Sequence, residues 1–194
     1  MSIRFDNRVA IVTGAGNGLG RRYALDLAAR GAKVVVNDLG GARDGSGGSV
    51  TAAQAVVDEI VAAGGEAMAN GSSVTDADGI FAMVEEVKAR WGRVDILINN
   101  AGILRDKTFT KMTLDDFRAV VDVHLMGSVI CTKAVWDLMR DQAYGRILMT
   151  TSSTGLYGNF GQANYGAAKL ALVGLMKTLA LEGAKYKVTI EPLL

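Results

Sequence analysis

The chain has one cysteine, one proline and one histidine among its 194 residues. The single cysteine, Cys131, excludes an internal disulfide framework and is typical of a reducing compartment. One histidine and one cysteine cannot build a typical transition-metal site, so we expect no bound metal. No apolar run approaches the ~20 residues of a membrane span, and the first ten residues lack the apolar centre of a signal peptide. These absences predict a soluble, cytoplasmic protein.

An excess of charge of one sign is also missing. Lys and Arg number 21 against 20 Asp and Glu, so no general field draws the chain to nucleic acid or anionic lipid. The apolar share of 49% is what a buried α/β sheet requires. The length suits one domain over residues 1–194, either whole or with parts missing.

Short apolar runs alternate with amphipathic helical patterns along the chain. The expected strands are 8–13, 33–37, 66–70, 94–99, 145–151 and 187–190, and the expected helices are 18–30, 50–63, 76–91, 114–140 and 162–183. Strands separated by helix-length crossovers predict a Rossmann-type, doubly wound parallel α/β sheet with helices on both faces. Residues 40–49, GGARDGSGGS, are typical of a flexible surface loop.

The first strand runs into a glycine-rich turn, TGAGNGLG, at residues 13–20. Such glycines let the backbone turn tightly and approach a pyrophosphate, while the following helix offers its N-terminal N–H groups. A glycine cluster alone is a weak signal, but here a strand precedes it and a helix follows it. The glycines are Gly14, Gly16, Gly18 and Gly20.

Two further strand ends carry candidate cofactor residues. The second strand is followed by Asp38, where an acid can accept hydrogen bonds from the adenosine ribose and repel the 2′-phosphate of NADP. We therefore expect NAD as cofactor; a helix-cap or loop role for Asp38 is the alternative. The fourth strand runs into Asn99, Asn100, Ala101 and Gly102. We expect Asn99 to hold neighbouring backbone and the other three residues to lie against the nicotinamide ribose.

A candidate catalytic set lies in SSTGLYGNFGQANYGAAK, residues 152–169. Tyr165 and Lys169 are four residues apart and therefore share one face of a helix. A phenol is a poor base because its reference pKa is about 10, but a nearby lysine cation favours the phenolate. Ser152, after the preceding strand, can donate a hydrogen bond to a substrate oxygen. The alternative is a chance pair, with a half-buried ring beside a solvated amine.

Together, the glycine turn, Asp38, NNAG and the Ser152, Tyr165 and Lys169 set resemble the short-chain dehydrogenase/reductase family. Within it, the chain is similar to the (3R)-hydroxyacyl-CoA dehydrogenase domain of peroxisomal-type multifunctional enzyme 2 and its bacterial relatives. The matching stretches are VVVNDLGG (34–41), NNAGILRD (99–106), VHLMGS (123–128) and YGNFGQANYGAAK (157–169).

The resemblance implies an NAD-dependent oxidoreductase that interconverts a secondary alcohol and a ketone, with a (3R)-3-hydroxyacyl-CoA as substrate. A 3-oxoacyl reductase, a hydroxysteroid dehydrogenase and a nucleotide-binding form with little turnover stay open as alternatives.

The resemblance also implies individual roles. Tyr165 would be the catalytic acid/base, Ser152 would hold the substrate oxygen, and Lys169 would bind the nicotinamide ribose. His124 stands where many family members carry a proton-relay asparagine; a lone histidine on an apolar helix face is otherwise a core residue. The further residues of the implied NAD site are Asn17 and Leu19 beside the glycines, and Ser73 and Val74 beside the adenine.

Two expectations concern the surface and the chain end. Apolar stripes on the outer sides of helices 114–140 and 162–183 predict a homodimer or homotetramer. They consist of Val120, Val121, Val129, Ile130, Leu170, Leu172, Val173, Leu175 and Met176. Because Pro192 cannot donate to a central ladder, the sixth strand should end early. We further expect that the sheet lacks its C-terminal strand, and that the chain is a truncated form that binds NAD weakly and turns over acyl-CoA poorly.

Overall fold

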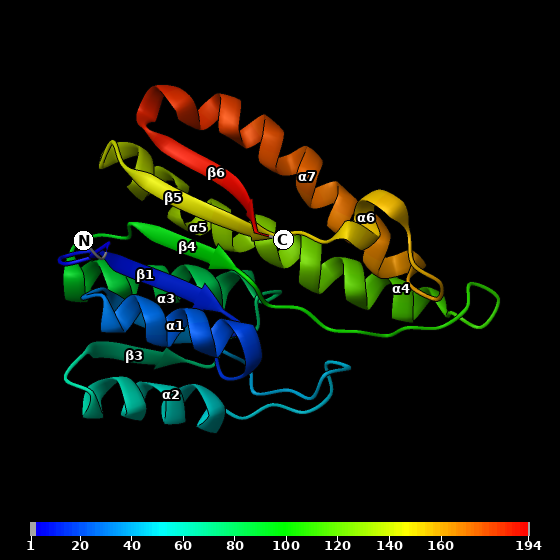
Figure 1. Ribbon diagram of the computed structural model, residues 1–194, viewed down its shortest axis with the longest axis horizontal. Coiled ribbons are helices and arrows are strands. Elements are labelled where there is room, and N and C mark those ends of the chain that lie inside the picture. The colour runs from blue at the N-terminus through cyan, green and yellow to red at the C-terminus, as the bar shows by residue number, and fades with distance from the viewer. Residues whose placement is uncertain (1–2, 194) are drawn as a thin grey trace.

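The computed structural model describes residues 3–193, which form one six-stranded parallel sheet. The strand order is β3-β2-β1-β4-β5-β6, with β3 and β6 at opposite edges (Figure 1). The strands are β1 (Val9–Thr13), β2 (Lys33–Asn37), β3 (Glu66–Asn70), β4 (Ile96–Asn99), β5 (Gly145–Thr150) and β6 (Val188–Leu193). The order reverses between β1 and β4, so a crevice forms beyond the carboxyl ends of these two strands. The predicted Rossmann-type fold is confirmed.

Helices cover both faces of the sheet because the strands bury side chains on both sides. One face carries α1 (Gly18–Ala29) and α2 (Thr51–Ala62). The other carries α3 (Ala77–Trp91), α5 (Gly127–Asp141) and α7 (Ala163–Gly183). Along β1, Ala10 and Val12 face the first pair of helices, while Val9 and Ile11 face the other three. All predicted strands and long helices are present, with ends displaced by no more than three residues.

A continuous helix spans Leu114–Asp141. It consists of α4 (Leu114–Val121), a π-helical turn, η1 (Asp122–Met126), and α5. By length and composition alone it could cross a membrane, contrary to the expectation from the sequence that no segment would. Its buried residues Cys131, Val135 and Met139 belong to the core against the sheet. The π-helical turn places one extra residue in the helix and presents His124 on the buried side.

The expectation that β6 ends early at Pro192 is wrong. β6 continues to Leu193, and Pro192 lies opposite Met149 of β5. Lys187 and Leu193 accept hydrogen bonds from Gly145 and Thr151 on the β5 side, so the nitrogen of Pro192 faces away from β5. Proline is tolerated at this position because no ladder hydrogen bond to β5 is lost.

The predicted apolar stripes mostly face inward, which corrects the basis given for oligomer formation. Val120 and Leu172 are buried, and Ile130, Leu175 and Met176 pack against the core. Within the described residues, Leu170 is the exposed member of the predicted set, with 49% of its surface accessible to solvent. The short helix α6 (Ser153–Tyr157) and the 3₁₀ turn η2 (Ala184–Tyr186) were not predicted, because elements of this length carry little periodicity.

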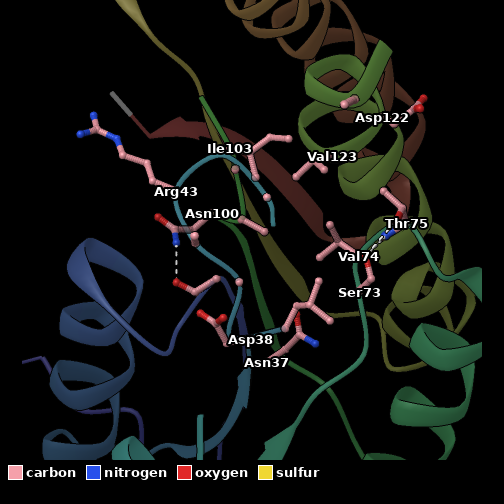
Figure 2. A pocket seen from close by; sticks show the side chains of 18 of the residues that line it. Asn37, Asp38, Arg43, Ser73, Val74, Thr75, Asn100, Ile103, Asp122 and Val123 are labelled. Atoms are coloured by element: carbon pink, nitrogen blue, oxygen red, sulfur yellow. Dashed lines mark hydrogen bonds between the residues drawn. The ribbon is translucent and has the colours of Figure 1, made fainter. Parts of the chain in front are cut away.

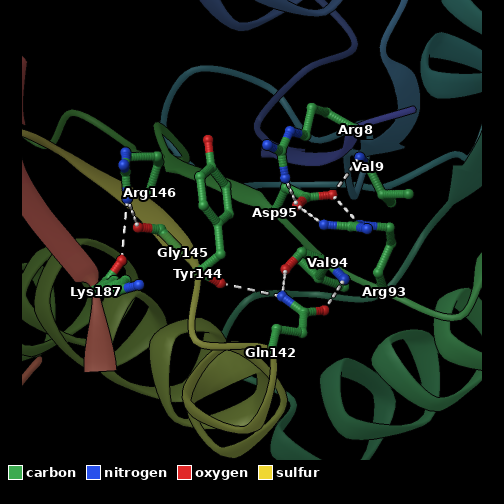
Figure 3. A network of polar contacts seen from close by, with 10 residues as sticks. All are labelled: Arg8, Val9, Arg93, Val94, Asp95, Gln142, Tyr144, Gly145, Arg146 and Lys187. Atoms are coloured by element: carbon green, nitrogen blue, oxygen red, sulfur yellow. Dashed lines mark hydrogen bonds and ion pairs between the residues drawn. The ribbon is translucent and has the colours of Figure 1, made fainter. Parts of the chain in front are cut away.

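A polar network closes the amino ends of the strands, opposite the crevice (Figure 3). The fully buried Asp95 carboxylate accepts hydrogen bonds from Arg8, Arg93 and the Val9 amide at 2.6–2.9 Å. Burial raises the pKa of Asp95, but these hydrogen bonds outweigh it and hold the pKa below its usual value. The Tyr144 ring lies against the Arg8 guanidinium, 4.0 Å from the ring centroid. This network joins β1, β4 and the turn before β5.

Candidate active site

A pocket of about 920 Å³ opens beyond the carboxyl ends of β1, β2 and β4 (Figure 2). Its volume lies within the usual range for small-molecule and cofactor sites. Nine residues predicted to bind the cofactor line it: Gly14, Asn17, Gly18, Asp38, Ser73, Val74, Asn100, Ala101 and Gly102. The other residues predicted to bind the cofactor are not among those that line this pocket: Gly16, Leu19, Gly20, Tyr165 and Lys169.

The glycine turn is built for close backbone approach. Gly14 has φ +62°, and a Cβ there would lie 2.8 Å from the Ala101 Cα. A Cβ on Gly20 would lie 2.2 Å from the Gly14 carbonyl oxygen, so Gly20 packs α1 against the turn and does not line the pocket. Gly18 meets nothing within 4 Å, and the exposed Leu19 follows it. The N-terminus of α1 is therefore open toward the pocket, as a diphosphate requires.

Asp38 is fixed at the edge of the pocket by two backbone amides. One carboxylate oxygen accepts from Gly16 N at 2.7 Å, and the other accepts from Gly40 N at 2.6 Å. Each oxygen retains a further lone pair. Asp38 can therefore hold the loop through these two amides and still accept hydrogen bonds from a ribose. Gly16 contributes its backbone amide to this arrangement.

The two asparagines differ from the expectation in which of them holds neighbouring backbone. Asn100, not Asn99, holds backbone: its Nδ2 donates to the carbonyl oxygens of Thr13 at 2.9 Å and Gly14 at 3.1 Å. Asn99 Nδ2 instead donates to the Thr132 hydroxyl at 3.1 Å, because successive strand residues point to opposite faces. Thr13, missed in the sequence, accepts from the amides of Asn100 and Ala101 and so joins the two strand ends.

Lys169 and Tyr165 lie together at the end of β5. The Lys169 side chain is buried, and its Nζ donates to the Thr150 carbonyl at 2.5 Å. The same Nζ lies 5.4 Å from the centroid of the half-buried Tyr165 ring. Burial lowers the pKa of Lys169 to about 8, so the lysine is still largely a cation at neutral pH. A positive charge therefore stands beside the phenol, as the sequence predicts.

Ser152 lies two residues beyond Thr150 and caps α6, with its Oγ accepting from Thr154 N at 3.2 Å. α6 packs tightly on α7: a Cβ on Gly155 would lie 2.8 Å from the Leu170 nitrogen. Ser152, Tyr165 and Lys169 are therefore gathered around the carboxyl end of β5.

His124 connects this group to the pocket. Its Nε2 lies 2.9 Å from the Ile103 carbonyl and 3.2 Å from the Ile103 nitrogen, and its ring meets the Tyr165 ring edge-on, with centroids 5.1 Å apart. Burial, followed by the charge of Lys169, lowers the pKa of His124 to about 4. Gly102 makes room for the ring, since a Cβ there would lie 2.2 Å from Cε1 of His124. His124 is therefore a neutral residue that joins the NNAG turn to Tyr165.

Residues 40–49 form the predicted surface loop, most of it exposed, and they also contact the segment that follows β4. Leu104 N donates to the Arg43 carbonyl, and Arg105 Nε donates to the Asp44 carbonyl, both at 2.9 Å. Arg43 and Gly45 line the pocket, and Gly45 packs against the Ile103 side chain. The loop therefore forms a wall of the pocket.

A profile of short chain dehydrogenases matches residues 8–193. The chain belongs to the short chain dehydrogenase family. This dehydrogenase is 57% identical over 186 residues to the peroxisomal multifunctional enzyme type 2 of Drosophila melanogaster. The aligned residues cover 96% of this chain and 31% of that enzyme. It is 56% identical over 190 residues to the peroxisomal hydratase-dehydrogenase-epimerase of Saccharomyces cerevisiae, and the aligned residues cover 98% of this chain and 21% of that enzyme. The chain thus spans less than a third of the length of either relative.

A solved structure similar to the dehydrogenase is a 7α-hydroxysteroid dehydrogenase complexed with NADH and 7-oxo glycochenodeoxycholic acid. The TM-score is 0.88 at 31% identity, over 97% of this chain and 70% of that one. Family membership makes the chain an oxidoreductase of the short chain dehydrogenase type. The open helix end, the glycine turn and the Asp38 carboxylate fit a dinucleotide cofactor.

Proposed function

We propose that the chain is an NAD-dependent dehydrogenase that interconverts a (3R)-3-hydroxyacyl-CoA and the corresponding 3-oxoacyl-CoA. The observation that carries the redox part of this proposal is the buried Lys169 cation beside the Tyr165 ring. The substrate class is supported by the likeness to multifunctional enzymes across nearly the whole chain. The likeness to a hydroxysteroid dehydrogenase, at 31% identity, supports a steroid substrate less strongly.

The preference for NAD is supported by Asp38. Its carboxylate is held at the pocket edge by the amides of Gly16 and Gly40, so it cannot turn away without losing both hydrogen bonds. A fixed negative charge at that edge repels a ribose 2′-phosphate. The ribose hydroxyls of NAD can instead donate to the free lone pairs of the carboxylate.

The chemistry follows from the charges around Tyr165. Tyr165, whose ring lies beside the Lys169 cation, accepts the proton of the substrate hydroxyl, and Ser152 donates a hydrogen bond to the same oxygen. When bound, the nicotinamide supplies the acceptor for the hydride. In the reverse direction Tyr165 returns the proton to the ketone oxygen. His124, which is neutral near pH 7, contacts Ile103 through its Nε2 and meets the Tyr165 ring edge-on.

The assembly is proposed as a homodimer or homotetramer, since family members typically form oligomers. Leu170 and Leu181 on α7 are exposed and provide apolar contact area for such an assembly. Light scattering at micromolar concentration tests this, and a monomer would refute it. The cytoplasmic location stays a prediction.

The substrate assignment is tested by following NADH absorbance at 340 nm with (3R)- and (3S)-3-hydroxyacyl-CoAs and hydroxysteroids. We expect turnover of the (3R)-thioesters, and loss of that turnover in Ser152→Ala. Ser153→Ala is the matched control, because Ser153 is the exposed neighbour in the same helix turn. Turnover of steroids alone would overturn the substrate class, and equal rates in the two serine variants would overturn the role of Ser152.

A further inference from the structure

Five residues between β4 and α4, Ile103–Lys107, lie between two parts of the molecule that are far apart in sequence. We call them the bridging segment. On one side they contact the loop of residues 40–49, which forms a wall of the pocket. On the other they contact the start of α7, which carries Tyr165.

The contacts with α7 lead directly to the backbone of Tyr165. Asn164, which is fully buried, donates from Nδ2 to the Arg105 carbonyl at 3.2 Å. Its Oδ1 accepts from the Tyr165 amide at 2.8 Å. Lys107 N also donates to the Gly161 carbonyl at 2.9 Å. The bridging segment therefore fixes the first turn of the catalytic helix.

The Arg105 side chain supplies the connection on the other side. Its Nε donates to the Asp44 carbonyl at 2.9 Å, and its Nη1 lies 3.6 Å from the Asp116 carboxylate of α4. The side chain is 32% exposed and Asp116 only 13%, so the pair is partly shielded from water. Arg105 thus contacts the loop and α4 through its side chain, and Asn164 through its carbonyl.

We propose that Arg105 is a positioning residue that couples the dinucleotide pocket to Tyr165. The inference rests on the proposed function, because it requires a dinucleotide against the loop wall. A dinucleotide held by that wall stabilises the Asp44–Arg105 contact, which in turn holds the Arg105 carbonyl against Asn164 and Tyr165. Coupling of this kind is reciprocal, so losing the contact weakens cofactor binding as well as slowing hydride transfer.

The test compares Arg105→Gln with two matched variants on the same part of the surface. Asp116→Asn removes the charge that pairs with Arg105 and, at 2.8 Å, with Lys107, but leaves the contacts of Arg105 with Asp44 and Asn164. Arg118→Gln removes an exposed arginine of α4 that pairs with Asp115. NADH fluorescence gives the Kd, single-turnover absorbance at saturating NAD gives the rate of hydride transfer, and thermal unfolding checks the fold.

For Arg105→Gln we expect a Kd for NADH about fivefold to tenfold higher and a similar loss in the saturated rate of hydride transfer, as for the loss of one hydrogen bond of ordinary net strength. Asp116→Asn should change both by less than about twofold, and Arg118→Gln should match the wild type. A wild-type rate in Arg105→Gln, or the full loss in Asp116→Asn, would overturn the coupling. A wild-type protein that neither binds NADH nor transfers hydride would instead overturn the proposed function.

Discussion

This protein should become less stable as the pH falls from about 7 to about 5, and replacing His124 by asparagine should abolish most of that loss. The folded state takes up a proton on His124 only near pH 4, because the ring is buried and faces the Lys169 charge. The unfolded chain takes up the same proton near pH 6.5. Between these values the unfolded state binds more protons, so the free energy of unfolding falls as the pH falls.

The magnitude follows from the interval between 6.5 and about 4. At roughly 1.4 kcal/mol per pH unit, complete titration costs roughly 3 kcal/mol, of which about 2 kcal/mol is lost by pH 5. His124 is the single histidine of the sequence, so no other histidine contributes to this loss. An asparagine at 124 does not titrate in this range.

The assay is urea unfolding followed by tryptophan fluorescence at pH 7 and pH 5, for wild type and His124→Asn. The wild type should lose about 2 kcal/mol between the two conditions, while the variant loses well under half of that. Parallel losses in the two proteins would refute the buried, neutral state of His124. They would also remove the reason for treating it as a neutral link between Ile103 and Tyr165.

Three further predictions concern charged residues. Lys169→Met should abolish turnover yet raise the free energy of unfolding at pH 7, since the fold holds a buried cation of pKa about 8. This gain in stability should shrink as the pH rises from 8 toward 10.5. A variant that is less stable than wild type in urea would contradict this. Asp95→Asn should lower the free energy of unfolding in urea by about 2 kcal/mol, because two arginines lose their buried counter-ion. Asp141→Asn, at an exposed ion pair, should lower it by almost nothing. Equal effects of the two substitutions would refute the role of the network. Asp38→Ser should lower the ratio of the NADP and NAD dissociation constants at least about tenfold in titrations, and an unchanged ratio would sink the assignment of cofactor preference.

The fold and much of the site follow from patterns that are local in the sequence. A strand, a glycine turn and a helix occur within one stretch of chain, and so do Tyr165 and Lys169 on one helix face. Asp38 is predictable because a strand end fixes its place relative to that turn. Such features need no knowledge of distant neighbours. The glycine turn and Asp38 line the pocket, and Lys169 lies beside the Tyr165 ring.

The features that were missed depend on which segments become neighbours. Pro192 is tolerated because its nitrogen faces away from β5, which the sequence of β6 does not state. Strand alternation decides whether Asn99 or Asn100 points toward Thr13. The role of Arg105 depends on contacts with Asp44 and Asn164, which lie about 60 residues away on either side. Tertiary register, rather than local propensity, determines these positions.

The most direct test of the central claim is hydride transfer in Tyr165→Phe beside the wild type, measured as NADH absorbance at 340 nm with a (3R)-3-hydroxyacyl-CoA. The substitution removes only the hydroxyl that accepts the substrate proton and leaves the Lys169 contact with Thr150 in place. We predict a rate at least about a hundredfold lower, with the Kd for NADH within about twofold of wild type. A Tyr165→Phe protein that retains most of the wild-type rate would contradict the assignment of Tyr165 as the acid/base and the mechanism built on it.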